Sequence, residues 1–292
     1  MSKLTRPTPK AGFPKAYFES DAHRNEFDPA LKHYPHAYVQ VRETAAKGAA
    51  LDATLRGMAH ARSRADVVVR GSVTLARWFG ERARPPHDID LVVRDASLAP
   101  DAPGAVALID DLRAAACEGL VRGGFRPLDA DVSLDGIWTY ERAEGRRLSI
   151  PFLPRSGAHA ALDAVQIDLV FRAPLHDATT FERSGDDPSH GLHFASRAES
   201  LAWKLLWLLT DIWPQAKDLY DAVLLAEDTE VPAHLLDAVG AESDGSWPNT
   251  LRSLRLADDS WPSFRAAHPS LAHFETAEAL LERLQEVLRV RT

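Results

Sequence analysis

Apolar residues follow two different rhythms along the chain, one before and one after residue 185. Before it, short apolar runs rich in Val, Ile and Leu have the length and composition of strands. After it, apolar residues recur at helical spacing over 196–210 and again from Pro214 to about Glu227, and further helices extend to Arg291. The strand-like runs are 67–69, 88–93, 136–142, 147–153 and 165–171.

Helical patterns also lie between the predicted strands. They cover 37–62, 74–80 and 107–123, and the last of these ends at Gly123-Gly124. Glu144-Gly145 between two strand-like runs predicts a hairpin turn. Because these elements alternate without a parallel β-α-β repeat, we predict an α+β fold: a mixed β-sheet with packed helices, followed by an α-helical domain.

The same patterns predict three segments. Residues 1–35 are rich in Pro, Lys, Asp and His without periodicity, which predicts an extended N-terminal arm. Residues 36–185 form the predicted α/β domain, and residues 190–292 form the predicted α-helical domain. The cluster of Gly, Asp and Pro over Ser184–Pro188 predicts a flexible linker between the two domains.

Composition narrows the class of protein. The chain has 292 residues, 45% of them hydrophobic and 26% charged, and no apolar run approaches the length of a membrane span. One cysteine, Cys117, excludes an internal disulfide and a cysteine-based zinc site, and a cytoplasmic location is expected. A net charge of -8 argues against a DNA-coating protein, but it does not exclude nucleic acid as a partner, because a local basic patch would suffice.

Two carboxylates one residue apart open the second strand, as Asp88-Ile89-Asp90. Side chains alternate across a strand, so Asp88 and Asp90 share one face and Ile89 takes the other. Asp168 is a third acid within an apolar strand, and three converging carboxylates are typical ligands of Mg²⁺ or Mn²⁺. The alternative is that Asp88 caps a turn and Asp90 is exposed at a strand edge.

Gly71-Ser72 lies between a predicted strand and a predicted helix. Glycine allows close approach of a ligand, and the helix N–H groups with the Ser72 hydroxyl could hold phosphate oxygens. The alternative is an ordinary N-cap serine.

Lys204 interrupts a helix crowded with leucine and tryptophan. Such a lysine usually extends its ammonium to the surface along an apolar stem; facing a ligand, it would bind a triphosphate. Asp218 and Asp221 lie three residues apart on the next helix, near its N-terminus, where acids are favoured in any case.

Together these residues resemble the AbiEii/AbiGii (MenT-like) toxins of the polymerase β-type nucleotidyltransferase superfamily. The resemblance rests on Gly71-Ser72, on Arg84 before Asp88-x-Asp90, on Asp168, and on two helical motifs. These motifs are Glu199-x-x-Ala202-x-Lys204-Leu205 and Lys217-Asp218-x-x-Asp221. A second glycine is usual in the family where Ser72 stands, and an arginine often found downstream of the Lys-Leu pair is missing near Asp211.

The resemblance implies a metal-dependent enzyme that transfers NMP from a nucleoside triphosphate to an acceptor and releases pyrophosphate. It implies that Asp88, Asp90 and Asp168 bind metal and act in catalysis with Asp218, while Gly71, Ser72, Lys204 and Arg84 bind the nucleotide. It also implies an RNA acceptor, the tRNA 3′ end, and an antitoxin protein that restrains a toxin. The alternatives are transfer to a small molecule, as in antibiotic modification, and a catalytically idle nucleotide- or RNA-binding relative.

Overall fold

The computed structural model describes the chain in two compact units that interleave in sequence. The described residues are 9–10, 13–14, 45–138, 143–154, 163–185, 187–211, 213–243, 247–256, 259–271 and 276–291. The first unit, here called the sheet unit, covers the described parts of Met1–Val73, Pro85–Pro174 and Thr180–Phe194. The second, the helical unit, covers the described parts of Thr74–Arg84, Leu175–Thr179 and Ala195–Thr292.

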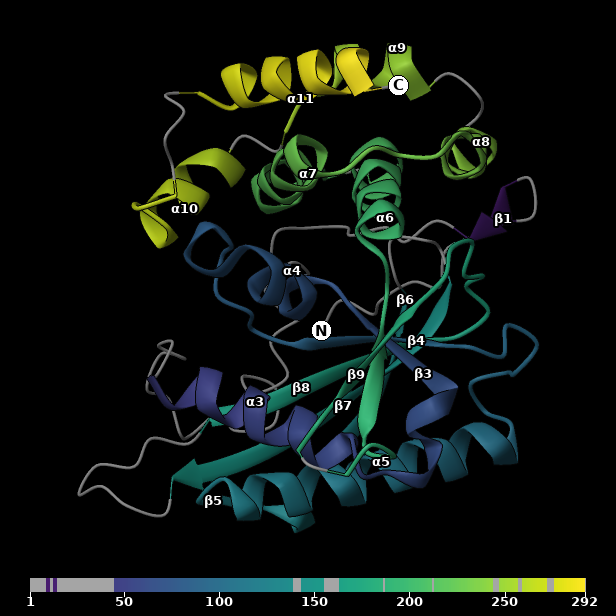
Figure 1. Ribbon diagram of the computed structural model, residues 1–292, viewed down its shortest axis with the longest axis vertical. Helices are drawn as coiled ribbons and strands as arrows, with labels where there is room; N and C mark the ends of the chain where they lie inside the picture. The colour runs from purple at the N-terminus through teal and green to yellow at the C-terminus, as the bar shows by residue number, and fades with distance from the viewer. Residues whose placement is uncertain are drawn as a thin grey trace. The chain divides into compact units, whose positions relative to one another are not determined.

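A mixed β-sheet forms the centre of the sheet unit (Figure 1). Its strand order is β5-β7-β8-β4-β3-β10-β9, and β6 pairs with β7. β4 runs parallel to β8 and β3 parallel to β10, whereas the other pairs are antiparallel, which confirms the predicted mixed sheet. The strands are β3 Val67–Arg70, β4 Ile89–Val93, β5 Phe125–Pro127, β6 Ser133–Trp138, β7 Glu144–Pro154, β8 Asp163–Val170, β9 Thr180–Arg183 and β10 Gly191–Phe194.

Helices α3 (Ala45–Met58) and α5 (Pro103–Arg122) pack against each other and share a core with one face of the sheet (Figure 1). The two helices approach closely at Gly57 and Gly119, where an added Cβ would lie 2.2 Å from the Ala115 carbonyl and 2.3 Å from the Ala53 carbonyl, respectively. The sheet contributes alternate residues to this core, including Ile89, Leu91, Ile167 and Leu169. The residues between them therefore project from the opposite face.

The helical unit has a separate apolar core. It is built from residues 74–79 of α4 (Ser72–Phe79) and from the helices of the C-terminal half. α6 packs against α7, and α7 packs against α10 and α11 (Figure 1). Its C-terminal helices are α6 Arg197–Thr210, α7 Ala216–Asp228, α8 Ala233–Glu242, α9 Trp247–Ser253, α10 Ser260–Ala267 and α11 Ala277–Arg291. Among the described residues of both units, the 3-10 helices are η1 Arg62–Asp66, η2 Gly80–Arg82 and η3 Asp129–Asp131.

The structure corrects the predicted linker. β9 and β10 pair antiparallel, so the segment between Arg183 and Gly191 joins two strands of one hairpin within the sheet unit. The Ser184 amide also donates to the His190 carbonyl at 2.9 Å across this turn. Short strands with mixed side chains give little alternation, and pairing with β3 stabilises β10 here. The predicted domain boundaries themselves stay predictions.

Three smaller differences concern the ends of elements. Glu144 and Gly145 are paired residues of β7, not a turn, because they continue the β6–β7 ladder opposite Trp138 and Ile137. The first long helix ends at Met58, and Arg62 belongs to η1. In the predicted N-terminal arm, β1 (Pro9–Lys10) pairs with β2 (Phe13–Pro14); its other residues, like 37–44 and 139–142, lie outside the described residues.

Candidate active site

Two of the predicted carboxylates lie side by side at the centre of the sheet. β4 and β8 are parallel neighbours, and their register places Asp90 opposite Asp168. Their flanking residues Ile89, Leu91, Ile167 and Leu169 belong to the core shared with α3 and α5, so both acids project from the other face of the sheet. β4 is also paired with β3 on its other side, so the alternative that Asp90 lies at an exposed strand edge is wrong.

Asp88 completes a cluster of three acids. One carboxylate oxygen from each of Asp88, Asp90 and Asp168 lies within 4.8 Å of the other two. Asp168 is 7% exposed, and the other two are partly buried. Converging carboxylate oxygens are the donors that a hard divalent cation prefers, and the partial exposure leaves room for the waters that Mg²⁺ retains. The residues present therefore fit such an ion.

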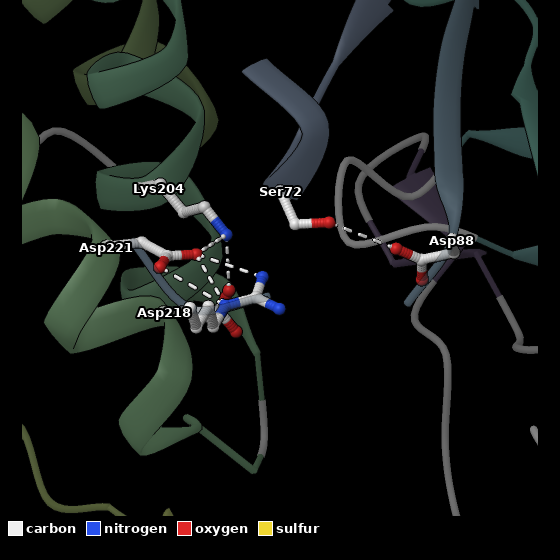
Figure 2. Close-up of polar contacts among 6 residues, drawn as sticks. Ser72, Asp88, Lys204, Asp218 and Asp221 are labelled. Atoms are coloured by element: carbon white, nitrogen blue, oxygen red, sulfur yellow. Dashed lines mark hydrogen bonds and ion pairs between the residues drawn. The ribbon is translucent and has the colours of Figure 1, made fainter. Parts of the chain in front are cut away.

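Gly71 and Ser72 bring the start of α4 against this cluster. Gly71 has φ of +75°, and a Cβ at this position would lie 2.1 Å from Asp90 Oδ2, so a side chain here would collide with the carboxylate. Ser72 is the first residue of α4 and is 1% exposed. Its hydroxyl donates to Asp88 Oδ1 at 3.3 Å (Figure 2), a contact beyond the ordinary N-cap alternative.

Arg147, a residue that the sequence patterns did not single out, binds Asp168 through two hydrogen bonds. Arg147 stands opposite Asp168 on β7, and its Nε and Nη2 donate to Oδ1 and Oδ2 at 2.9 and 2.7 Å. Burial raises the pKa of Asp168, although Arg147 opposes this shift; burial lowers the pKa of Arg147, but Asp168 reverses this and leaves it raised. Arg147 alternates with the core residue Leu148, so period two alone could have placed it on the face of the acids.

The other predicted residues form a buried ion network in the helical unit. Lys204 Nζ on α6 donates to Asp218 Oδ1 at 2.7 Å and lies 2.9 Å from Asp221 Oδ2 (Figure 2). Arg84 donates hydrogen bonds to the same Asp221: its Nε is 3.2 Å from both carboxylate oxygens, and its Nη2 is 3.0 Å from Oδ2. Two cations thus balance two carboxylates, as low-dielectric surroundings require.

The ion partners outweigh burial in setting the pKa values of Lys204 and Asp221. Lys204 is 3% exposed and its ammonium lies 4.6 Å from the Trp207 ring centroid, so the surface-directed alternative for this lysine is wrong. Burial by itself would lower the pKa of Lys204, but Asp218 and Asp221 reverse the shift and raise it. Burial would likewise raise the pKa of the fully buried Asp221, yet Arg84 and Lys204 hold it below its ordinary value.

Comparison with protein-family models decides the family. The model described as "Nucleotidyl transferase AbiEii toxin, Type IV TA system" matches residues 53–286. The chain belongs to this AbiEii family. An AbiEii-family protein is a nucleotidyltransferase, which confirms the predicted enzyme class and the predicted toxin of a toxin–antitoxin system at that level.

Two further comparisons add little to the family match. The chain is similar in structure to the crystal structure of a "putative nucleotidyltransferase from H. pylori". The match covers 90% of this chain and 94% of the H. pylori chain, at 13% sequence identity and a TM-score of 0.48. No curated protein matches the sequence. Among the described residues, no helix has both the length and the apolar character that crossing a bilayer requires.

Glu199 opens the helical motif that carries Lys204 in this AbiEii-family chain, but it does not contribute to the ion network. The Ser196 hydroxyl accepts from the Glu199 amide at 3.0 Å and caps α6. The Glu199 carboxylate accepts from the His176 amide at 3.0 and 3.1 Å, and burial raises its pKa against these hydrogen bonds. Glu199 therefore anchors the segment Leu175–Thr179 to the start of α6 within the helical unit.

The predicted site residues thus fall into two groups. Gly71, Ser72, Asp88, Asp90 and Asp168 belong to the sheet unit, where backbone geometry and register bring them together. The second group comprises Arg84, Lys204 and Asp218, which share one ion network with Asp221 in the helical unit. Each group combines carboxylates with groups that donate hydrogen bonds to them.

Proposed function

We propose that this AbiEii-family chain transfers a nucleotide from a nucleoside triphosphate to RNA, at the 3′ end of tRNA, with Mg²⁺ or Mn²⁺ as cofactor. The observation that carries the proposal is the convergence of Asp88, Asp90 and Asp168 on one face of the sheet. Family membership supports nucleotidyl transfer. The acceptor is the one that the resemblance to the MenT-like toxins implies. An antitoxin protein that restrains the activity belongs to the same proposal.

Asp88, Asp90 and Asp168 would hold the cation, which when bound neutralises the triphosphate and polarises its α-phosphate. Ser72 and the first N–H groups of α4 offer hydrogen-bond donors for phosphate oxygens beside the cluster. The protein would then align the triphosphate with the acceptor and neutralise the phosphate charge, and its side chains would take little part in covalent chemistry.

Lys204 and Arg84 are the proposed phosphate-binding cations, and Asp218 is the acid proposed to act on the acceptor. In the structure each of these cations contacts a carboxylate of the ion network. A phosphate that binds them has to share or replace these carboxylates. Asp218 would then be released from Lys204 and become available to orient or deprotonate the attacking hydroxyl.

The decisive experiment is transfer of label. The purified protein is incubated with total RNA, Mg²⁺ and each α-labelled nucleoside triphosphate in turn, beside Asp88→Asn and Asp90→Asn. Label is expected in RNA of tRNA length with the parent, and it should be absent with either variant or with EDTA. Label on a small molecule in a cell extract instead of RNA would move the proposal to small-molecule modification. Full transfer by both variants would exclude the metal site proposed here.

A further inference from the structure

A row of four charged residues crosses the centre of the sheet. Arg147, Asp168, Asp90 and Arg70 stand opposite one another on the neighbouring strands β7, β8, β4 and β3. Directly opposed residues project from the same face of a sheet, so the two acids lie between two arginines. Arg70 is 2% exposed, and Asp88 adds the third carboxylate beside the row.

Arg147 holds both oxygens of Asp168. The two parallel hydrogen bonds of 2.9 and 2.7 Å form the planar fork that arginine makes with carboxylates. The side chains of Arg147 and Asp168 are only 12% and 10% exposed, so water screens the pair weakly. The Gln166 amide lies 3.3 Å from each of the same oxygens, so both already have protein donors.

These hydrogen bonds limit the number of oxygen lone pairs that Asp168 can offer to a cation. A carboxylate oxygen has two lone pairs, and on each oxygen of Asp168 one is directed to Arg147. Within the cluster, three carboxylates against the two guanidinium groups of the row leave one net negative charge. A single divalent ion already reverses that charge, so a second ion would enter a positive site.

We propose that Arg147 restrains metal loading: it holds both oxygens of Asp168, adds positive charge beside the cluster, and so limits the nucleotide-free site to one weakly bound divalent ion. The inference rests on the proposed function, because it concerns the same metal site. It assigns to Arg147 an effect on ion affinity that is separate from any effect on folding.

The test measures Mn²⁺ binding to the full chain without nucleotide, by electron paramagnetic resonance of the free ion at pH 8. The parent is expected to bind one ion. Arg147→Met removes one positive charge beside the cluster and should bind the first ion about tenfold more tightly. Arg147→Lys keeps the charge without the fork and should stay within about threefold of the parent.

Two further variants make the result specific. Arg146→Met removes the adjacent arginine, which pairs with Asp101, and should leave Mn²⁺ affinity at the parental value. Arg147→Gln removes the charge but keeps an amide donor beside Asp168. It should also bind the first ion about tenfold more tightly, and it decides the question if Arg147→Met alone fails to fold.

Parental affinity in a folded Arg147→Met, or loss of its ion, would overturn the inference and leave the proposed function intact. Parental affinity in a folded Arg147→Gln overturns it as well, whether or not Arg147→Met folds. If the parent binds no Mn²⁺, and gains none with any nucleoside triphosphate, the metal site of the proposed function fails together with the inference.

Discussion

The buried contacts of Lys204 predict how its substitution should change the stability of the fold. Lys204→Met keeps the apolar stem but leaves Asp218 and Asp221 with one cation fewer in a buried network. Breaking a buried pair by removing one partner costs roughly 3–5 kcal/mol. The free energy of unfolding, measured with urea, should fall by about that amount.

Lys217→Met is the matched control, because Lys217 is an exposed lysine on the neighbouring helix α7. Its effect should stay within about 0.5 kcal/mol. Adding Asp218→Asn to Lys204→Met should recover part of the loss, since it removes the carboxylate that the lysine leaves behind. Equal stability of Lys204→Met and Lys217→Met would show that the ion network does not stabilise the fold.

The pH dependence of stability follows from Asp221. Its pKa is lowered from 3.8, because Arg84 and Lys204 together outweigh the effect of burial. A carboxyl group with a depressed folded-state pKa contributes stability above its unfolded pKa and loses it as pH falls through the folded value. The stability difference between parent and Asp221→Asn should therefore be constant near neutrality and shrink below pH 3.8. Denaturant titrations from pH 2 to 7 measure it; a difference that grows on acidification would reverse the assigned shift.

At the scale of elements, the turn between β3 and α4 decides whether the acid cluster can form. Gly71→Ala places a Cβ in a left-handed conformation, at a cost of about 1–2 kcal/mol, and pushes it against Asp90 Oδ2. We expect lower stability, Mn²⁺ affinity reduced by at least about tenfold, and loss of transfer. Mn²⁺ titration and the transfer assay measure these effects.

Gly80→Ala is a control for the backbone cost alone. Gly80 has φ of +56°, but an added Cβ meets nothing within 4 Å. Gly80→Ala should lower the stability by an amount similar to Gly71→Ala, while its Mn²⁺ affinity should equal that of the parent. Similar ion affinity in both variants would mean that the close approach of Gly71 to Asp90 has no role in the site.

At the scale of the whole molecule, the two units have separate apolar cores and carry separate groups of polar residues. A cation held by Asp88, Asp90 and Asp168 should stabilise the sheet unit by mass action, by about 2.7 kcal/mol at one hundred times the dissociation constant. Hydrogen exchange measured by mass spectrometry should therefore slow in β3, β4 and β8 when Mn²⁺ is added, and α8–α11 should change little.

Asp90→Asn is the control for this exchange experiment and should abolish the protection. Protection by Mn²⁺ that persists in this variant, or that is confined to α8–α11, would place the ion elsewhere in the molecule.

Much of this protein was determined by the sequence alone. The period of two along 88–93 and 165–171 places Ile89 and Ile167 in the core and the acids on the other face, because strand side chains alternate. The helices that carry Lys204 and Asp218 follow from apolar spacing close to 3.6, and their ends differ from the prediction by one or two residues. These features are local, so they can be read from neighbours in the chain.

Only the tertiary structure decided which side chains meet. Register between β4, β8 and β7 aligns Asp90, Asp168 and Arg147, and no local pattern states which strands become neighbours. Arg84 and Asp221 are 137 residues apart in the sequence. Their contact belongs to the buried ion network in which Lys204 pairs with Asp221, so the Lys204 ammonium is not directed to the surface. β9 and β10 form because they pair with each other and because β10 also pairs with β3, while their own four-residue sequences have little strand character. The position of a buried charged side chain depends on the tertiary fold, because such a side chain is stable only where a distant segment supplies its counter-ion.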